Sequence, residues 1–169
     1  MHSCRTRWVF DFEGAAATVS LRGLLAGIEN PAPLLERFGE YGLRTTRERF
    51  KTQKAPDGSA WEALEPWYMK EKRRNKGRIL TLNGYLRGQM TWQLAGARSV
   101  EWGSSLPYAS VHQDGATIVP RTAKFLMFRG HVAKSVTISA RPYLGLSEAD
   151  EKELVAITLD WLSSSGGFK

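Results

Sequence analysis

The chain has 169 residues, of which 42% are hydrophobic, a size and composition typical of a single folded domain and not of a disordered chain. Its 24 Lys and Arg exceed its 17 Asp and Glu by seven, and so basic a chain is a candidate for binding nucleic acid. No apolar run is long enough to cross a bilayer. Cys4 is the only cysteine, which excludes an internal disulfide and a cysteine-rich zinc site. A chain so poor in cysteine is expected to fold in a reducing cytoplasm.

The first predicted elements are mostly helical. Residues 1–20 form an N-terminal extension in which the aromatic run 8–12 is a possible strand, and residues 20–28 have apolar side chains at helical spacing. The next helix is predicted from Pro31, behind an Asn cap, to Lys51. Two glycines on its inward face would let another backbone approach closely. That face comprises Leu35, Phe38, Gly39, Gly42, Leu43, Thr46 and Phe50.

The middle of the chain alternates turns with short elements. Residues 55–59 contain Pro-Asp-Gly, which predicts a turn, after which Trp61 and Leu64 should return to the core. A short helix opens at Pro66 and gives way to an exposed basic loop that ends near Arg78. A second helix is expected over residues 80–90, with Leu82, Tyr85, Leu86 and Met90 turned inward. Residues 91–94 and 99–102 then predict a hairpin around Gly96.

The last third is predicted to be rich in strands. A short helix over 107–113 precedes strands at 117–119, 124–128 and 132–139. Ser147 and Asp150 form a capping box that opens a final helix, and a flexible tail is expected over 163–169. The inward residues of that helix are Leu154, Ile157, Trp161 and Leu162. This order predicts one α+β domain over residues 1–169, with an antiparallel sheet of about four strands packed by helices.

The basic charge is concentrated in the middle of the chain. Residues 44–87 hold twelve Lys and Arg but five Asp and Glu, a difference equal to the net charge of +7. Residues 148–160 hold five acids against Lys152, so the chain has a basic middle and an acidic end. These could be two solvated helix faces, or charged surfaces that meet DNA or a second copy of the chain. The candidate contact residues are Arg44, Arg47, Lys51, Lys70, Lys72, Arg73, Arg74, Lys76 and Arg78.

No pattern of catalytic or metal-binding residues accompanies this charge. The three histidines, His2, His112 and His131, have no second ligand at a metal-site spacing, and His112 lacks a nucleophile context. Asp57 is best explained as a turn residue. We therefore expect no enzyme, metal or cofactor. Trp67 and Tyr68 lie beside the basic cluster and could stack on bases, so a nucleic-acid-binding module is kept as an alternative.

Four short motifs occur in order along the chain. The first combines Phe50-x-x-Gln53 with Pro56-Asp57-Gly58-x-x-Trp61-x-x-Leu64, and the second is Ile79-Leu80-Thr81-x-x-Gly84-x-Leu86. The third is Tyr108-Ala109-x-x-His112-Gln113-x-Gly115, and the fourth runs from Ala140 through Arg141-Pro142-Tyr143 to Ser147. In this order and spacing, the motifs resemble those of the phage virion morphogenesis family, which includes tail completion proteins. The resemblance covers residues 31–162.

The resemblance implies a structural protein of the head–tail neck, of the tail completion or terminator type, that forms a ring, often a hexamer, at the tail end. Its implied partners are other copies of itself, the tail tube and neck or connector proteins, with non-specific DNA contact in the channel and no membrane. It would be assembled in the host cytoplasm and reside in the virion. A head-side neck adaptor is the alternative. Structural roles explain the motif residues better than contact roles; these are Pro56, Asp57, Gly58, Trp61, Tyr108, His112, Gln113, Arg141 and Pro142.

Overall fold

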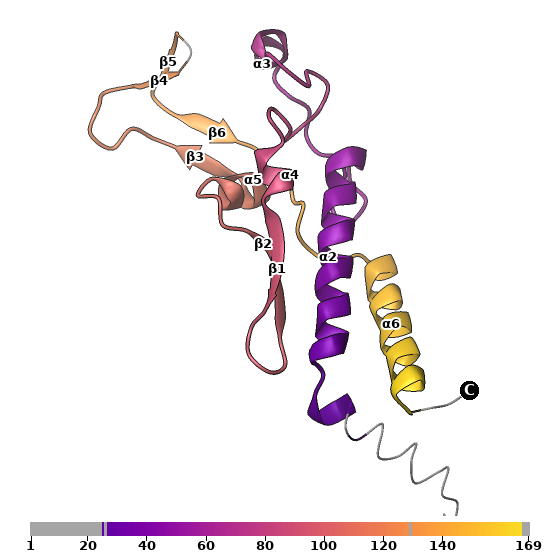
Figure 1. Ribbon diagram of the computed structural model, residues 1–169. Helices are drawn as coiled ribbons and strands as arrows, with labels where there is room; N and C mark the ends of the chain where they lie inside the picture. The colour runs from indigo at the N-terminus through magenta and orange to yellow at the C-terminus, as the bar shows by residue number, and fades with distance from the viewer. Residues whose placement is uncertain (1–24, 26, 129, 167–169) are drawn as a thin grey trace, which may run out of the picture.

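A long helix forms the axis of the molecule, with a second helix on one side and the strands on the other (Figure 1). The computed structural model describes residues 25, 27–128 and 130–166. The axial helix is α2 (Ala32–Thr52), and α6 (Glu148–Gly166) lies alongside it. The strand predicted at 8–12 and most of the helix predicted at 20–28 lie outside the described residues.

The helix α2 confirms the prediction for residues 31–51. It ends where Gln53 adopts a left-handed conformation, with φ of 57°, and donates its N–H to the Arg49 carbonyl oxygen. Gly39 and Gly42 do permit a close approach, but of indole rings and not of a backbone. A Cβ at Gly39 would lie 2.6 Å from the Trp92 ring, and one at Gly42 would lie 2.6 Å from the Trp102 ring. The glycines therefore seat the two tryptophans against the helix.

These tryptophans come from the predicted hairpin, which the structure confirms as β1 (Met90–Leu94) and β2 (Val100–Ser104). The strands are antiparallel, and Trp92 pairs with Trp102. Gly96 takes a φ of 80° in the connecting turn, a conformation that glycine adopts without strain. The buried core lies beside this hairpin and is formed by Phe50, Ala55, Trp61, Leu86, Met90, Ala109 and Tyr143.

The helix predicted over residues 80–90 is mostly wrong. The segment holds one turn of helix, α4 (Tyr85–Gly88), and Met90 already belongs to β1. Leu80 adopts a φ of 53° and Gly84 a φ of 81°, which breaks the helix before it can start. Leu86 and Met90 are buried as predicted, whereas Tyr85 is exposed. The two other short helices are α3 (Pro66–Glu71) and α5 (Ala109–Asp114), close to their predicted places.

The remaining strands form an arm that extends from the helical body (Figure 1). Strand β3 (Ala116–Ile118) pairs with β6 (Val136–Ile138), and β4 (Leu126–Phe128) pairs with β5 (His131–Ala133), both antiparallel. We call residues 116–138 the arm. The α+β class is confirmed, but the described strands form three two-stranded sheets in place of one sheet of about four. The single strand predicted at 132–139 divides between β5 and β6.

The closing helix α6 begins at the predicted capping box. Ser147 donates its N–H and its hydroxyl to Asp150 Oδ2, and the Asp150 N–H donates to Ser147 Oγ. Trp161 is buried, and Leu154, Ile157 and Leu162 are half-buried. The helix continues to Gly166, four residues beyond its predicted end. None of the helices in the described part of the chain is long and apolar enough to cross a membrane.

Candidate assembly surfaces

The fourth sequence motif fastens the end of the arm to the rest of the molecule. Arg141 follows β6, and its guanidinium donates to the carbonyl oxygens of Glu62 at 2.9 Å and Ala63 at 3.2 Å. The indole N–H of Trp61 donates to the Pro142 carbonyl oxygen at 2.7 Å. Two distant motifs, around Trp61 and around Arg141, therefore meet and hold each other's backbone.

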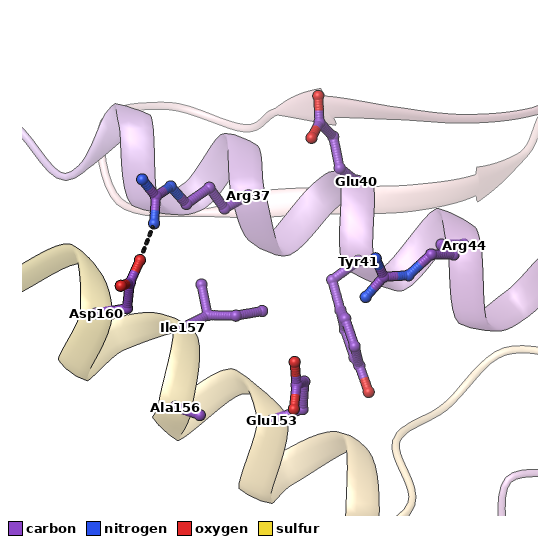
Figure 2. Close-up of a pocket in the computed structure, with 8 residues that line it drawn as sticks. All are labelled: Arg37, Glu40, Tyr41, Arg44, Glu153, Ala156, Ile157 and Asp160. Carbon is purple, nitrogen blue, oxygen red and sulfur yellow. Dashed lines mark hydrogen bonds and ion pairs between the residues drawn. The ribbon is translucent and has the colours of Figure 1, made fainter.

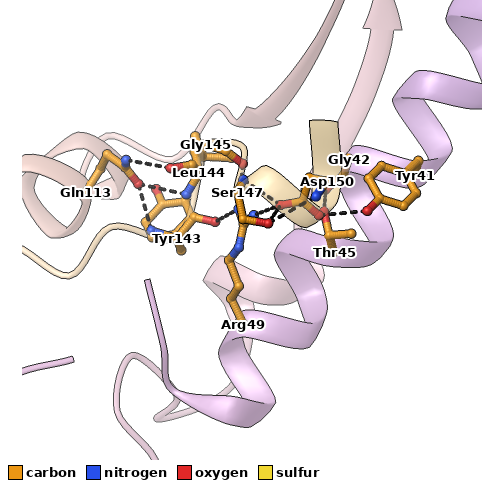
Figure 3. A network of polar contacts seen from close by, with 10 residues as sticks. All are labelled: Tyr41, Gly42, Thr45, Arg49, Gln113, Tyr143, Leu144, Gly145, Ser147 and Asp150. Carbon is orange, nitrogen blue, oxygen red and sulfur yellow. Dashed lines mark hydrogen bonds and ion pairs between the residues drawn. The ribbon is translucent and has the colours of Figure 1, made fainter. Parts of the chain in front are cut away.

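The third motif, on α5, binds the same segment (Figure 3). The side-chain oxygen of Gln113 accepts the N–H groups of Tyr143 and Leu144, both at 3.0 Å, and its amide nitrogen donates to the Leu144 carbonyl oxygen. The hydroxyl of Tyr143 donates to the Ala109 carbonyl oxygen at 2.9 Å. Gln113 thus satisfies three backbone groups that no strand or helix would pair.

A buried ion pair then connects this segment to α2 and α6. Arg49 lies 2.6 Å from Asp150 Oδ2, and both side chains are less than 10% exposed. Arg49 also donates to the carbonyl oxygens of Tyr143 and Gly145, and Tyr41 donates its hydroxyl to Asp150 Oδ1 (Figure 3). These hydrogen bonds satisfy both charged groups, as an ion pair must be satisfied when it is buried. We call Arg49, Gln113, Arg141, Tyr143 and Asp150 the junction.

The protonation states agree with this arrangement. Burial alone would raise the pKa of Asp150, but hydrogen bonds from Ser147 and Tyr41 and the charge of Arg49 outweigh it, so the pKa lies below its ordinary value. Burial, followed by the hydrogen bond to Asp150, raises the pKa of Tyr41 to about 12. At neutral pH the aspartate is therefore ionised and the tyrosine hydroxyl keeps the proton that it donates.

Tyr108 and His112 share a face of α5, as their spacing predicts, and their ring centroids are 5.9 Å apart. Both line a cavity of about 480 Å³ between α3, the loop before α4, and β6. Burial and the nearby charge of Arg141 lower the pKa of His112, so its ring is neutral at pH 7. Its Nδ1 atom has no hydrogen-bond partner. No described group of three His, Cys, Asp or Glu side chains could hold a metal ion.

The remaining motif residues, Pro56, Asp57 and Gly58, form the predicted turn. The Asp57 carboxylate accepts both the N–H and the hydroxyl of Ser59, and these hydrogen bonds lower its pKa. Gly58 adopts a φ of 84°. The carboxylate of Asp57 therefore stabilises the turn by accepting hydrogen bonds from Ser59.

The basic candidates divide between α2 and the loop after α3, and all but one are exposed. Arg44, Arg47 and Lys51 line a groove together with Arg87. Lys70, Arg73, Arg74, Lys76 and Arg78 are exposed on α3 and the following loop. Lys72 differs from the sequence expectation, because its side chain is buried and its ammonium donates to the carbonyl oxygens of Asn75 and Arg78. Burial lowers the pKa of Lys72, and the residue serves to close the loop.

The acidic helix is partly neutralised within its own chain. Arg37 pairs with Asp160 at 2.8 Å across an open groove of about 590 Å³ between α2 and α6. Figure 2 shows Glu153 on the α6 side of this groove and Tyr41 and Arg44 on the α2 side. Both this contact and the Arg49–Asp150 pair hold α6 on α2, and the second of them joins the basic region 44–87 to the acidic region 148–160 within one chain.

Sequence reasoning missed the roles of Tyr41 and Arg49. Arg49 follows Gly42 and Thr46 at helical spacing, which places it beside the inward stripe of α2, and this was the available signal. The pairing with Asp150 had no such signal, because 101 residues separate the two.

Comparison with known proteins gives two matches. The sequence model of the phage virion morphogenesis family matches residues 13–163. Protein G of Escherichia phage Mu, whose name gives it a proposed role in capsid assembly, is 32% identical over 118 residues, which are 66% of this chain and 67% of the relative. No solved structure matches the chain.

Proposed function

Since the chain belongs to the phage virion morphogenesis family, we propose that it is a structural protein of the head–tail neck, of the tail completion type. It acts by assembling into a ring, a hexamer, on the end of the tail tube, where the ring receives the head. Its role is structural and not catalytic. The observation that carries this proposal is the family match, which spans residues 13–163 and so includes the axial helix, the arm and most of α6.

The distribution of exposed side chains supports assembly. Large apolar residues are exposed on the arm, at Val119, Met127 and Val132, and on α6, at Val155 and Leu159. Apolar side chains exposed together mark protein–protein contacts more often than isolated ones do. A ring needs two different contact surfaces on each copy, and the arm and α6 lie on opposite sides of α2 (Figure 1).

The exposed basic residues add a contact of a different kind. Arg44 and Arg47 on α2, and Arg73 and Arg74 in the loop after α3, are available for phosphate groups. We propose that they line the channel through which DNA passes. Such contacts are independent of sequence and weaken as salt concentration rises.

Deletion of the gene from a phage that carries it, with the gene resupplied from a plasmid, tests the proposal. Without the protein, we expect separate heads and tails under the electron microscope. The tails should also vary in length, because an uncapped tube end can continue to add subunits. Resupply should restore joined particles, and an image of the neck should locate the chain as a ring at the tail end. Normal particles in the absence of the gene would refute the proposal.

The same experiment distinguishes the head-side adaptor. Loss of an adaptor would leave capped tails of uniform length beside heads that fail to keep their DNA. The nucleic-acid-binding alternative predicts instead that the free protein binds duplex DNA tightly at physiological salt, with no ring in the neck. Charge reversal at Arg73 and Arg74 should impair head joining while the fold is retained, and an unchanged particle yield would exclude a role for that loop.

A further inference from the structure

The tip of the arm has an apolar side that nothing in the described chain covers. Met127 is 81% exposed and Val132 is 59% exposed. These residues face each other across the β4–β5 pair, so their side chains project from the same side of the sheet. Ile118, Val119 and Phe125 are also exposed along the arm.

Contacts with α3 fix the direction in which this apolar side faces. His131 Nε2 lies 3.1 Å from Glu71 Oε1, and the His131 and Trp67 rings are 4.7 Å apart between centroids. Side chains alternate along a strand, so Val132 points to the side opposite His131. The tip of the arm is therefore attached to the body on one side and presents Met127 and Val132 on the other.

The charge of the arm has a single sign. Residues 116–138 contain no Asp or Glu. Arg121, Lys124 and Lys134 are exposed along it. A partner surface that combines apolar side chains with carboxylates would therefore complement the arm in both respects.

The molecule carries such a surface on α6. Val155 and Leu159 are 59% and 61% exposed, one helical turn apart, on the face turned away from Trp161 and α2. Glu148 and Glu151 are exposed on the preceding turns, with the exposed Lys152 beside them, so this face carries two carboxylates and one ammonium group. These two glutamates are distinct from Asp150 and Asp160, which pair with Arg49 and Arg37 of the same chain. We call Glu148, Glu151, Val155 and Leu159 the outer face of α6.

We propose that the arm of one copy lies on the outer face of α6 of the next copy. This rests on the ring assembly proposed above and identifies its interface. Met127 and Val132 pack against Val155 and Leu159, while the arm's cations face Glu148 and Glu151. Because the two surfaces differ and lie on opposite sides of α2, the contact is head-to-tail and leaves each copy able to accept another (Figure 1).

Cross-linking between copies tests the contact directly. In a background where Cys4→Ser removes the native thiol, Met127→Cys and Leu159→Cys are introduced together, and purified particles and free protein are treated with a short bismaleimide. We expect a ladder of covalent oligomers that ends at the size of the ring. A control with Thr91→Cys, exposed on β1, in place of Met127→Cys should give no ladder. Neck rings that form without the Met127–Leu159 cross-link would overturn the interface and leave the proposed function standing.

A charge exchange provides the second test and does not depend on thiol chemistry. Lys124→Glu with Lys134→Glu should lower the yield of joined particles about fivefold, and so should Glu148→Lys with Glu151→Lys, given the modest strength of exposed ion pairs. All four substitutions together should restore the yield to within about twofold. Failure of the combined variant to recover, when circular dichroism shows that it is folded, would overturn the pairing. Particle formation that needs no copy of the gene would instead refute the proposed function.

Discussion

The buried pair of Arg49 and Asp150 gives the sharpest prediction for stability. Arg49→Ala removes three hydrogen bonds, to Asp150, to the Tyr143 carbonyl oxygen and to the Gly145 carbonyl oxygen. It also leaves the Asp150 carboxylate buried without a cation, which typically costs about 3–5 kcal/mol. Because Ser147 and Tyr41 still donate to Asp150, we expect the lower end of that range, about 3 kcal/mol.

Urea and thermal unfolding measure this loss. For a chain of this length, about 3 kcal/mol corresponds to a fall in Tm of about 6–12 °C. Arg47→Ala is the matched control, since Arg47 lies two residues away on α2, is exposed, and makes a single 3.3 Å hydrogen bond to the Met90 carbonyl oxygen. The control should lose about 0.5 kcal/mol. A loss below about 1 kcal/mol for Arg49→Ala would refute a tightly packed ion pair at this position.

The pH dependence of stability gives an independent measurement of the same pair. The pKa of Asp150 is lower in the folded protein than its ordinary value, since the hydrogen bonds and Arg49 outweigh the effect of burial. Its ionised form therefore stabilises the fold fully above about pH 4, and the stabilisation is lost as the pH falls through the lower folded pKa. Arg49→Ala should reduce this acid dependence. An acid unfolding profile with the same slope in both proteins would contradict the assignment.

Three further predictions concern other parts of the structure. Gly42→Ala should destabilise the folded protein by about 1–3 kcal/mol, because its Cβ would lie 2.6 Å from the Trp102 ring. The control Gly88→Ala, whose Cβ would enter open space, should leave stability unchanged. Equal unfolding midpoints for the two variants would refute the close packing at Gly42. Lys72→Ala should speed tryptic cleavage at Arg73 and Arg74 by releasing the loop that its ammonium closes, and an unchanged cleavage rate would show that the loop is held otherwise. In an ultraviolet titration, Tyr41 and Tyr143 should ionise near pH 12, because burial is the main factor that raises both pKa values. Ionisation of these two side chains near pH 10, the ordinary value for tyrosine, would contradict their burial.

Local sequence patterns predicted the elements whose structure depends on local contacts. The helix over 31–51 follows from its apolar spacing, the hairpin from alternation around Gly96, and the start of α6 from the capping box at Ser147. The helix expected over 80–90 failed because a distant contact controls its start. The Gln53 side chain accepts the Ile79 N–H, and Leu80 adopts a φ of 53° in the turn that follows.

The site was predictable only in part, for the same reason. The motif residues could be named from the sequence, but Gln113 and Arg141 act on backbone groups 30 or more residues away. Charge counting identified the basic middle and the acidic end, yet it could not distinguish Lys72, which is turned into its own loop, from its exposed neighbours. The exposed apolar residues of the arm and α6 were also missed, since nothing local distinguishes an exposed Val155 from a buried one.

The junction gives these separate features a common role. The fourth motif is the only covalent link between the last strand of the arm, which ends at Ile138, and α6, which begins at Glu148. Hydrogen bonds tie this short link to three other parts of the chain. Within the link, Arg141 donates to the backbone before α3, while Gln113 on α5 and Arg49 on α2 bind backbone groups of the link itself. These contacts fix the angle between the arm and α6. A head-to-tail ring closes only when the rotation between its two contact surfaces is correct. In the proposed assembly, the motif residues would therefore determine ring closure through that angle, without themselves touching a neighbouring copy.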